Sequence, residues 1–194
     1  MPANTELSPQ SSLQTVFLDR DGVLNKKMAE GCYVTRREDL HLLDGVPEAI
    51  ARLNRAGVRV IVVSNQRGVA RGLMTAADVE LIHAALQERL KPHGAHVDRF
   101  YFCPHGKGEC TCRKPLPGMF EQARVDFPEI EAAASVMIGD SLSDIEFGRR
   151  LGMKTVFIAG NPEQQKPGAA SAGERADLRC DSLLEAVQGL LPKS

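Results

Sequence analysis

Short apolar runs alternate with helical patterns along the chain, and this alternation restricts its fold more than any other feature. The runs lie at 15–18, 58–63, 97–102, 135–138 and 154–159 and hold four to six residues each, the length of a strand buried on both faces. Strands that alternate with helices form a parallel sheet, and the helices then cover both of its faces. We therefore predict an α/β fold, a doubly wound, Rossmann-like parallel sheet.

Helix start and stop signals fill the intervals between the runs. Pro47 stands in the first turn of one helical pattern, and Gly57 follows its last residues. Thr75 and Asp78 have the spacing of a capping box, which marks the start of another helix. The sequence predicts helices at 44–57, 75–91, 117–127 and 143–152, a short last helix opened by Ser182 and Glu185, and a flexible loop at 160–176.

The composition favours one soluble domain that does not bind nucleic acid. The 194 residues include 24 Lys and Arg against 25 Asp and Glu, so the strongly basic charge of a nucleic-acid-binding protein is absent. No apolar run approaches the ~20 residues of a membrane span. Residues 1–14 lack Lys, Arg and the apolar region of a signal peptide. We expect a flexible tail at 1–13, a single domain at 14–192, a monomer, and a cytoplasmic location.

Polar side chains follow four of the predicted strands at the point where each strand ends. Parallel strands place their carboxyl ends at one edge of the sheet, where ligands of such folds bind. Carboxylates gathered there repel one another unless a hard cation binds them, which predicts Mg²⁺, and a lysine beside the metal suits a phosphate group. The residues concerned are Asp19 and Asp21, Ser64, Lys114, and Asp140 with Asp144.

Each of these motifs also has a simpler interpretation. The DRDG sequence at 19–22 is compatible with a turn, because Asp-Gly pairs mark turns, whereas a calcium loop needs its glycine at the sixth position. The GDSLSD sequence at 139–144 is compatible with a capped strand-to-helix turn, and Ser64 with an ordinary loop serine. Their occurrence together at successive strand ends favours a functional site.

The motifs, in this order, resemble those of the haloacid dehalogenase superfamily of phosphatases. They are FLDRDGVLN at 17–25, VVSNQ at 62–66, CRKP at 112–115 and IGDSLSD at 138–144. With SNQRGVARG at 64–72 and the cysteine segment, the chain resembles the branch that contains D,D-heptose 1,7-bisphosphate phosphatases and histidinol-phosphate phosphatases. The resemblance covers about 15–160. The chain departs from it at Ser141, where some relatives carry a lysine, and in its short cysteine loop.

The resemblance implies a role for each site residue in the hydrolysis of a phosphate ester. Asp19 is the nucleophile that forms an aspartyl-phosphate, and Asp21 is the general acid and base. Ser64 and Lys114 bind the phosphoryl oxygens. The implied magnesium ligands are Asp19, the main-chain carbonyl of Asp21, and Asp140, with Asp144 behind them, and the residues facing the substrate are Asn65, Gln66, Arg67 and Arg113.

Three of the five cysteines lie close together with a histidine: Cys103, His105, Cys110 and Cys112. These four soft ligands complete a tetrahedral Zn²⁺ shell and leave no position for water, which predicts a structural zinc site. Because Lys114 follows the last cysteine so closely, zinc would fix its direction. The alternative is an accidental cluster of reduced thiols. We interpret Cys32 and Cys180 as free thiols.

The intervals between the motifs are too short for a separate cap domain. A predicted helix and strand already fill about half of the interval from Asp21 to Ser64. We expect an open crevice, with access controlled by loops at 25–34 and 103–112. The predicted function is a Mg²⁺-dependent phosphatase of a small sugar phosphate, with the 7-phosphate of heptose bisphosphate favoured and histidinol phosphate as the alternative. A nucleic-acid 3′-phosphatase and a non-catalytic, zinc-stabilised binding module are two further alternatives.

Overall fold

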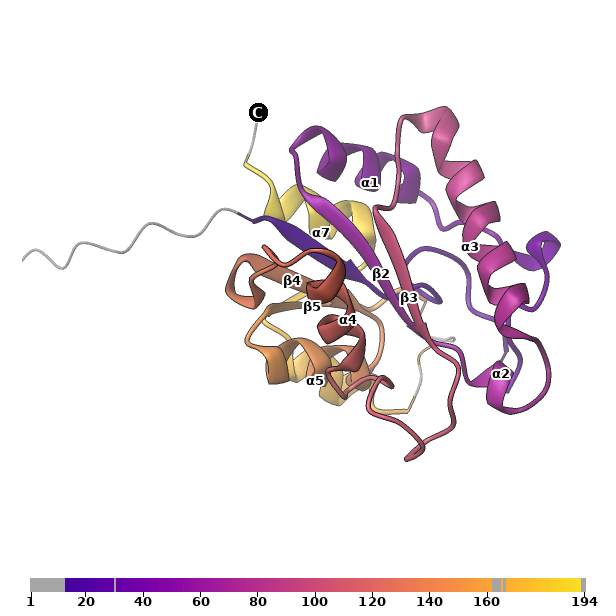
Figure 1. Ribbon diagram of the computed structural model, residues 1–194. Coiled ribbons are helices and arrows are strands. Elements are labelled where there is room, and N and C mark those ends of the chain that lie inside the picture. Colours follow the sequence, from indigo (N-terminus) through magenta and orange to yellow (C-terminus); the bar gives the residue numbers. More distant parts are fainter. Residues whose placement is uncertain (1–12, 30, 162–164, 166, 193–194) are drawn as a thin grey trace, which may run out of the picture.

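A parallel β-sheet forms the centre of the computed structural model, which describes residues 13–29, 31–161, 165 and 167–192 (Figure 1). In these residues the sheet has six strands in the order β3-β2-β1-β4-β5-β6, and every pairing is parallel. This order is one of the doubly wound arrangements, so the predicted fold class is confirmed. The strands are β1 (Thr15–Leu18), β2 (Arg59–Asn65), β3 (Arg99–Cys103), β4 (Ser135–Gly139), β5 (Lys154–Ile158) and β6 (Leu178–Cys180).

Helices cover both faces of this sheet (Figure 1). One face carries α1, α3 and α7, and the other carries α4, α5 and α6. No helix in the described part of the chain is both long and apolar enough to cross a membrane. The α-helices are α1 (Val46–Arg55), α2 (Arg67–Ala70), α3 (Ala76–Leu90), α4 (Gly118–Asp126), α5 (Leu142–Leu151), α6 (Ala169–Arg175) and α7 (Leu183–Leu190), and the 3₁₀ turns are η1 (Arg37–Asp39), η2 (Lys91–His93) and η3 (Ala132–Ala134).

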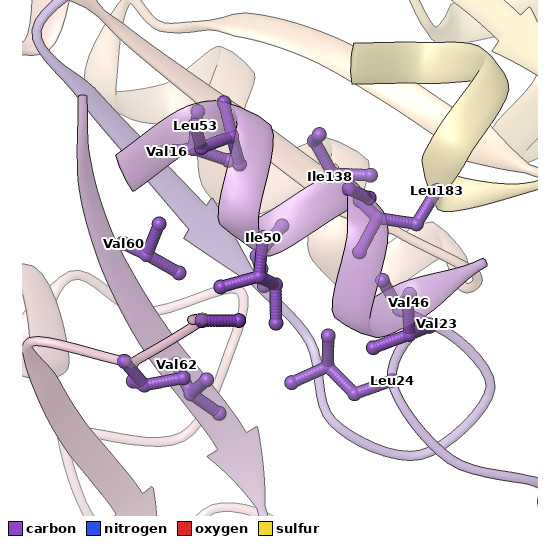
Figure 2. Close-up of a cluster of buried hydrophobic side chains, with 14 of the residues drawn as sticks. Val16, Val23, Leu24, Val46, Ile50, Leu53, Val60, Val62, Ile138 and Leu183 are labelled. Atoms are coloured by element: carbon purple, nitrogen blue, oxygen red, sulfur yellow. The ribbon is translucent and has the colours of Figure 1, made fainter. Parts of the chain in front are cut away.

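The central strand β1 shows why both faces need helices. Val16 and Leu18 belong to a buried cluster with Ile50 of α1 (Figure 2). Phe17, between them, belongs to a second cluster with Phe147 of α5. Successive side chains of a strand point to opposite faces of the sheet, so a strand with apolar residues at successive positions must be covered on each side.

The register of β1 brings the polar strand ends together. Leu18 lies opposite Val62 of β2 and opposite Ile138 of β4. The segments that follow these three residues therefore leave the sheet side by side at one edge. This is the edge at which the sequence predicts a ligand site.

No separate cap domain covers this edge in the described residues. The chain from Asp21 to Ser64 forms η1, α1 and β2 with their loops, and the chain from Ser64 to Lys114 forms α2, α3, η2 and β3. Both intervals belong to the sheet and its covering helices. The absence of a cap agrees with the prediction from the lengths of the intervals.

The predicted loop at 160–176 is wrong over its last part, where the structure has α6, followed by β6. The buried residues of α6 are Ala169 and Ala172, which pack against α5 and β5. These side chains are too small to produce a clear apolar period, and β6 is a largely exposed edge strand, so neither element has a strong sequence signal. Residues 162–164 and 166 of the predicted loop lie outside the described residues.

The predicted helix starts are confirmed. The Thr75 hydroxyl accepts from the backbone N–H of Asp78 at 3.2 Å, and the Asp78 carboxylate accepts from the backbone N–H of Thr75 at 2.7 Å, which forms the capping box of α3. Ser182 accepts from the backbone N–H of Glu185 at 3.2 Å at the start of α7. The four-residue helix α2 was not predicted, because it is too short to show a period. Of the predicted tail, Leu13 alone is described, and it packs half-buried against the core.

Candidate active site

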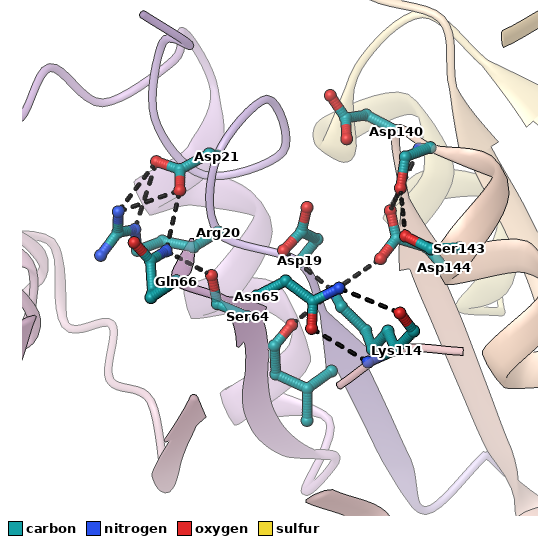
Figure 3. A network of polar contacts seen from close by, with 12 residues as sticks. Asp19, Arg20, Asp21, Ser64, Asn65, Gln66, Lys114, Asp140, Ser143 and Asp144 are labelled. Carbon is teal, nitrogen blue, oxygen red and sulfur yellow. Dashed lines mark hydrogen bonds and ion pairs between the residues drawn. The ribbon is translucent and has the colours of Figure 1, made fainter. Parts of the chain in front are cut away.

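Three buried aspartates meet at the carboxyl edge of the sheet. Asp19 follows β1 directly, Asp140 follows β4, and Asp144 lies in the first turn of α5. The backbone N–H of Asp19 donates to the Ile138 carbonyl at 3.0 Å, so β4 fixes the position from which the Asp19 side chain extends. One carboxylate oxygen of each aspartate lies within 4.8 Å of the other two (Figure 3). We call these three residues the acidic cluster.

Lys114 balances part of the negative charge of the acidic cluster. Its ammonium lies 3.0 Å from Asp19 Oδ1 and 2.6 Å from Asp144 Oδ1, and it donates to the Val63 carbonyl at 2.6 Å. Burial disfavours the charged ammonium, but the carboxylates of Asp144 and Asp19 outweigh burial and raise the pKa of Lys114. The lysine therefore stays charged at the edge of the sheet where an anionic group can bind.

Asp144 supports this lysine from behind. Its Oδ1 contacts Lys114, and its Oδ2 accepts from the backbone N–H of Ser141 at 3.0 Å and from the Ser141 hydroxyl at 2.5 Å. The second pair of contacts is part of the capping box that begins α5. A side chain at Gly139 would collide with Asp144, so the glycine is needed for this close approach. Asp144 thus orients Lys114 and anchors the helix.

Asp140 faces the turn made by the DRDG sequence. Gly22 has a φ of 98°, a left-handed value that favours glycine, and a side chain there would collide with Asp140 Oδ2. The ammonium of Lys27 pairs with the same Asp140 carboxylate. Carboxylate oxygens gathered in this way are the ligands that Mg²⁺ prefers, so the donors of the acidic cluster fit a magnesium ion.

Asp21 points into a separate network, held mainly by Arg20 (Figure 3). The Arg20 side chain is 0% exposed, and its Nη2 lies 3.1 Å and 2.9 Å from the two carboxylate oxygens of Asp21. Asn25 Nδ2 and Gln66 Nε2 donate to the same carboxylate at 2.9 Å and 3.0 Å. Burial alone would raise the pKa of Asp21, but the charge of Arg20 and the hydrogen bonds lower it. Asp21 is therefore an ionised, oriented carboxylate that is still 27% exposed.

Gln66 joins this network to Ser64. The Gln66 side-chain nitrogen donates to Ser64 Oγ at 2.6 Å while it also contacts Asp21. Ser64 is the sixth residue of β2, two positions beyond the partner of Leu18. The strand thus places the hydroxyl on the same edge of the sheet as the acidic cluster.

His83 of α3 is buried beside Arg20. Its ring stacks on Phe100 with centroids 4.6 Å apart and meets the edge of Phe102 at 5.8 Å. Burial lowers the pKa of His83 to about 3, helped by the positive charge of Arg20 and opposed by Asp21. The folded protein therefore holds this histidine neutral.

The neutral histidine predicts a loss of stability in mild acid. Because the pKa of His83 is depressed on folding, the unfolded chain takes up a proton below pH ~6.5, while the folded chain does not until much lower pH. Between pH 7 and pH 5 this difference costs about 2 kcal/mol of unfolding free energy. Urea unfolding at pH 7 and pH 5 measures the decrease in unfolding free energy between the two pH values. We expect this decrease to be smaller in His83→Leu than in wild type, by about 2 kcal/mol. The exposed His96→Gln variant should keep the wild-type fall, and an equal fall in His83→Leu would refute the assignment.

Asn65 fixes the backbone of Lys114. Its Oδ1 accepts from the Lys114 backbone N–H at 2.9 Å, and its Nδ2 donates to the Lys114 carbonyl at 3.1 Å. The backbone N–H of Gln66 also donates to the Cys103 carbonyl at 2.8 Å. The end of β2 therefore holds both ends of the cysteine loop. The sequence predicts that Asn65 faces the substrate, and in the structure its side chain bonds to the backbone of Lys114.

The cysteine loop forms a second candidate metal site. The Sγ of Cys110 lies 3.4 Å from those of Cys103 and Cys112, and His105 Nδ1 lies 3.7 Å and 3.4 Å from the sulfurs of Cys103 and Cys112. Zinc bonded tetrahedrally to sulfur and nitrogen gives ligand separations of roughly 3.5–3.8 Å. Burial and the neighbouring thiols raise the pKa of Cys112. These four residues can hold a metal ion, which would favour the thiolate forms.

The remaining predicted residues are next to site residues in the sequence, since Arg67 follows Gln66 and Arg113 precedes Lys114. Arg67 begins α2 and is exposed. Arg113 Nη1 donates to the His105 carbonyl at 3.4 Å within the cysteine loop. No sequence pattern predicts a role for Arg20 or Lys27, although Arg20 contacts Asp21 and Lys27 contacts Asp140. A buried arginine has no sequence signal of its own, and Lys27 stood out only as part of the predicted access loop.

Comparison with known proteins gives consistent matches. A HAD-hydrolase-like family model matches residues 111–186. A D-glycero-alpha-D-manno-heptose-1,7-bisphosphate 7-phosphatase of Mycobacterium tuberculosis (strain ATCC 25618 / H37Rv) is 39% identical over 171 residues, 88% of this chain and 87% of that protein. A D-glycero-beta-D-manno-heptose-1,7-bisphosphate 7-phosphatase of Escherichia coli (strain K12) is 35% identical over 189 residues, 92% of this chain and 94% of that protein.

Solved structures agree with the sequence relatives. The D,D-heptose 1,7-bisphosphate phosphatase from B. bronchiseptica, complexed with magnesium and phosphate, has a TM-score of 0.79 and 30% identity, and the match covers 91% of this chain and 97% of that one. The D,D-heptose 1,7-bisphosphate phosphatase from Burkholderia thailandensis has a TM-score of 0.65 and 28% identity, covering 93% and 99%. The similarity therefore extends over nearly the whole length of each chain.

Proposed function

Because this chain belongs to the haloacid dehalogenase-like phosphatases, in the family of the heptose 1,7-bisphosphate 7-phosphatases, we propose that it removes the 7-phosphate of a D-glycero-D-manno-heptose 1,7-bisphosphate. The enzyme is a phosphoric monoester hydrolase. The observation that carries the proposal is the meeting of Asp19 with Lys114 and Asp140 at the carboxyl edge of the sheet. A nucleophilic carboxylate, a fixed ammonium and a hard-cation site are what transfer of a phosphoryl group to the protein requires.

Asp19 is the proposed nucleophile. Its carboxylate attacks phosphorus, the bond to the sugar oxygen breaks, and an aspartyl-phosphate forms on Asp19. Lys114, already 3.0 Å from Asp19 Oδ1, meets the phosphoryl oxygens and stabilises their charge as it redistributes. Ser64 donates its hydroxyl to the same oxygens. Water then attacks phosphorus, the bond from phosphorus to the Asp19 oxygen breaks, and inorganic phosphate leaves as the free carboxylate is restored.

Asp21 is the proposed acid and base in these two steps. It protonates the leaving sugar oxygen and then accepts a proton from the attacking water. The contacts with Arg20 keep the carboxylate in the ionised form, which is the form the second step needs. A phosphate dianion beside Asp21 opposes the charge of Arg20, which favours protonation for the first step. Arg20 and Gln66 position this carboxylate, since each donates to it directly.

The two candidate metal sites have different proposed roles. Asp19, Asp140 and the main-chain carbonyl of Asp21 hold Mg²⁺, which when bound neutralises phosphoryl charge and orients the substrate. The B. bronchiseptica structure, complexed with magnesium, supports this assignment. The four residues of the cysteine loop hold a structural Zn²⁺, supported by ligand separations close to those of a tetrahedral shell.

The substrate is a small phosphorylated sugar that enters an open crevice. We propose that Arg67 and Arg113 bind its anionic groups from α2 and from the cysteine loop, because Arg67 directly follows Gln66 and Arg113 directly precedes Lys114. Asn65 and Gln66 contribute by holding Lys114, Asp21 and Ser64 in place.

Steady-state kinetics tests the substrate assignment. The values of kcat/KM should be compared for the α and β anomers of heptose 1,7-bisphosphate, for histidinol phosphate and for a 3′-phosphorylated oligonucleotide. We expect one heptose anomer to exceed histidinol phosphate at least about tenfold, a difference of ~1.4 kcal/mol in transition-state binding. A higher value for histidinol phosphate would move the chain to the alternative substrate, and no phosphate release from any compound would favour a binding module.

Metal removal should stop catalysis reversibly. After EDTA treatment and desalting, we expect phosphate release to fall below about 1% of the original rate, because Asp19 and Asp140 no longer share a cation that can orient the phosphoryl group. Addition of Mg²⁺ should restore the rate. Zinc content should be measured in the same samples, so that loss from the cysteine loop is separated from loss at the acidic cluster. Restoration by Zn²⁺ but not by Mg²⁺ would contradict the assignment of the catalytic metal.

A further inference from the structure

Lys27 places a second ammonium in the acidic cluster. Lys114 pairs with two members of this cluster, Asp19 and Asp144. Lys27 pairs with the third member, Asp140. The Lys27 side chain is 13% exposed although it lies on a loop, so most of its length is covered. The buried carboxylate of Asp140 therefore has a cationic partner supplied by the protein itself.

Hydrogen bonds of the loop backbone fix the position from which the Lys27 side chain extends to Asp140. On one side of Lys27, Asn25 Nδ2 donates to the Lys26 carbonyl at 2.9 Å, and the backbone N–H of Gly22 donates to the Asn25 carbonyl at 2.8 Å. The backbone N–H of Lys26 donates to the His41 carbonyl at 2.8 Å. These bonds fix the chain immediately before Lys27, so the side chain starts from a defined position next to the DRDG turn.

The Lys27 side chain lies against Asp140, one of the proposed magnesium ligands. A side chain at Gly22 would collide with Asp140 Oδ2 and with Lys27 Cε alike, so both groups lie directly over the DRDG turn. That turn contains Asp19 and Asp21. An ammonium in contact with Asp140 and a divalent cation bound to the same carboxylate repel each other, because they are like charges at short distance.

We propose that Lys27 is a tethered counter-cation of the magnesium site: it neutralises Asp140 in the metal-free enzyme and lowers the affinity for Mg²⁺, which must displace it. This inference rests on the proposed function, since it takes the acidic cluster to be the Mg²⁺ site. The lysine stabilises the metal-free acidic cluster, where it adds a positive charge to that of Lys114 beside three carboxylates. Any stabilisation of the metal-free state by Lys27 subtracts from the free energy of metal binding.

A matched pair of lysine variants tests the proposal by direct metal binding. Mg²⁺ is titrated calorimetrically into EDTA-treated, desalted wild type, Lys27→Met and Lys26→Met, without substrate. We expect Lys27→Met to bind Mg²⁺ about tenfold more tightly than wild type, which corresponds to ~1.4 kcal/mol. The neighbouring Lys26→Met removes the same charge one residue away, and its affinity should stay within about twofold of wild type. Equal or weaker binding by Lys27→Met, or equal tightening by Lys26→Met, would overturn the proposal.

Thermal unfolding gives a second readout that does not depend on activity. Without Mg²⁺, Lys27→Met should unfold at a lower temperature than wild type, and saturating Mg²⁺ should raise its Tm by more than it raises that of wild type. Lys27→Arg keeps the charge and should retain the weaker, wild-type Mg²⁺ affinity. This variant is titrated in place of Lys27→Met if the methionine variant does not fold without metal. If wild type releases phosphate with Mg²⁺ while Lys27→Met binds Mg²⁺ as wild type does, the inference about Lys27 fails and the proposed function stands. If wild type binds no Mg²⁺, both fail.

Discussion

Asp19→Asn is expected to lower kcat at least about a thousandfold while the fold is kept. The side-chain amide has nearly the shape of the carboxylate but cannot act as a nucleophile, so the covalent step is lost. Removal of its charge also weakens the contact with Lys114 and the binding of a cation at the acidic cluster. Phosphate release from heptose bisphosphate, measured under substrate saturation and excess Mg²⁺, checks the expected loss.

A surface variant and an unfolding curve make this result specific. Asp181→Asn, at an exposed position between β6 and α7, removes one carboxylate away from the site and should leave kcat unchanged. Asp19→Asn should unfold as cooperatively as wild type, because the strand β1 that precedes it keeps its pairing with β2 and β4. A variant that kept a tenth of wild-type kcat would show that Asp19 is not the nucleophile.

Cys110→Ser is expected to lose about one zinc ion per chain and to lower kcat/KM by roughly 10- to 100-fold, the range seen when supporting residues around a metal are removed. Cys110 contacts the sulfurs of both Cys103 and Cys112, so its loss opens the ligand shell. Lys114 lies two residues after Cys112, and a loosened loop misplaces its ammonium relative to Asp19. Zinc analysis of the purified variant, together with its kinetics, measures both effects.

The rest of the sheet should survive this change. The buried cluster around Val16 contains none of the four residues of the cysteine loop's metal site. The cluster around Phe17 includes Cys103, with Cys110 and Cys112 packed against it, but most of its members lie elsewhere in the sheet and its helices. Cys180→Ser, in β6, is the matched control and should keep both zinc and activity. If Cys110→Ser cannot be purified, Cys112→Ser or chelator-treated wild type provides the zinc-free protein. Zinc-free protein with unchanged kcat/KM would show that the cluster does not position Lys114.

The strands and the meeting point of the site could be predicted because they depend on local patterns. The runs that became β1, β2 and β4 are mostly apolar, and parallel pairing then carries Asp19, Ser64 and Asp140 to one edge without further information. The capping box at Thr75 depends only on residues three apart. For these strands and this helix start, which residue type and spacing predict, the sequence and the structure agree.

The contacts that could not be predicted from the sequence depend on the path of the chain in space. Arg20 would be expected at the surface from its charge alone, yet its pairing with Asp21 buries it completely. Asn65 contacts the backbone of Lys114 across 49 positions of sequence, and no local pattern encodes that contact. Lys27 reaches Asp140 because its loop is tied to His41, which the sequence does not show.

The most direct test of the central claim is a ³¹P NMR time course of wild-type protein with heptose 1,7-bisphosphate and Mg²⁺. The account predicts that the 7-phosphate signal disappears, that one equivalent of inorganic phosphate appears, and that the 1-phosphate signal remains. The same mixture with Asp19→Asn should stay unchanged over the same period. Loss of the 1-phosphate first, or full persistence of both signals with the wild-type protein, would contradict the account.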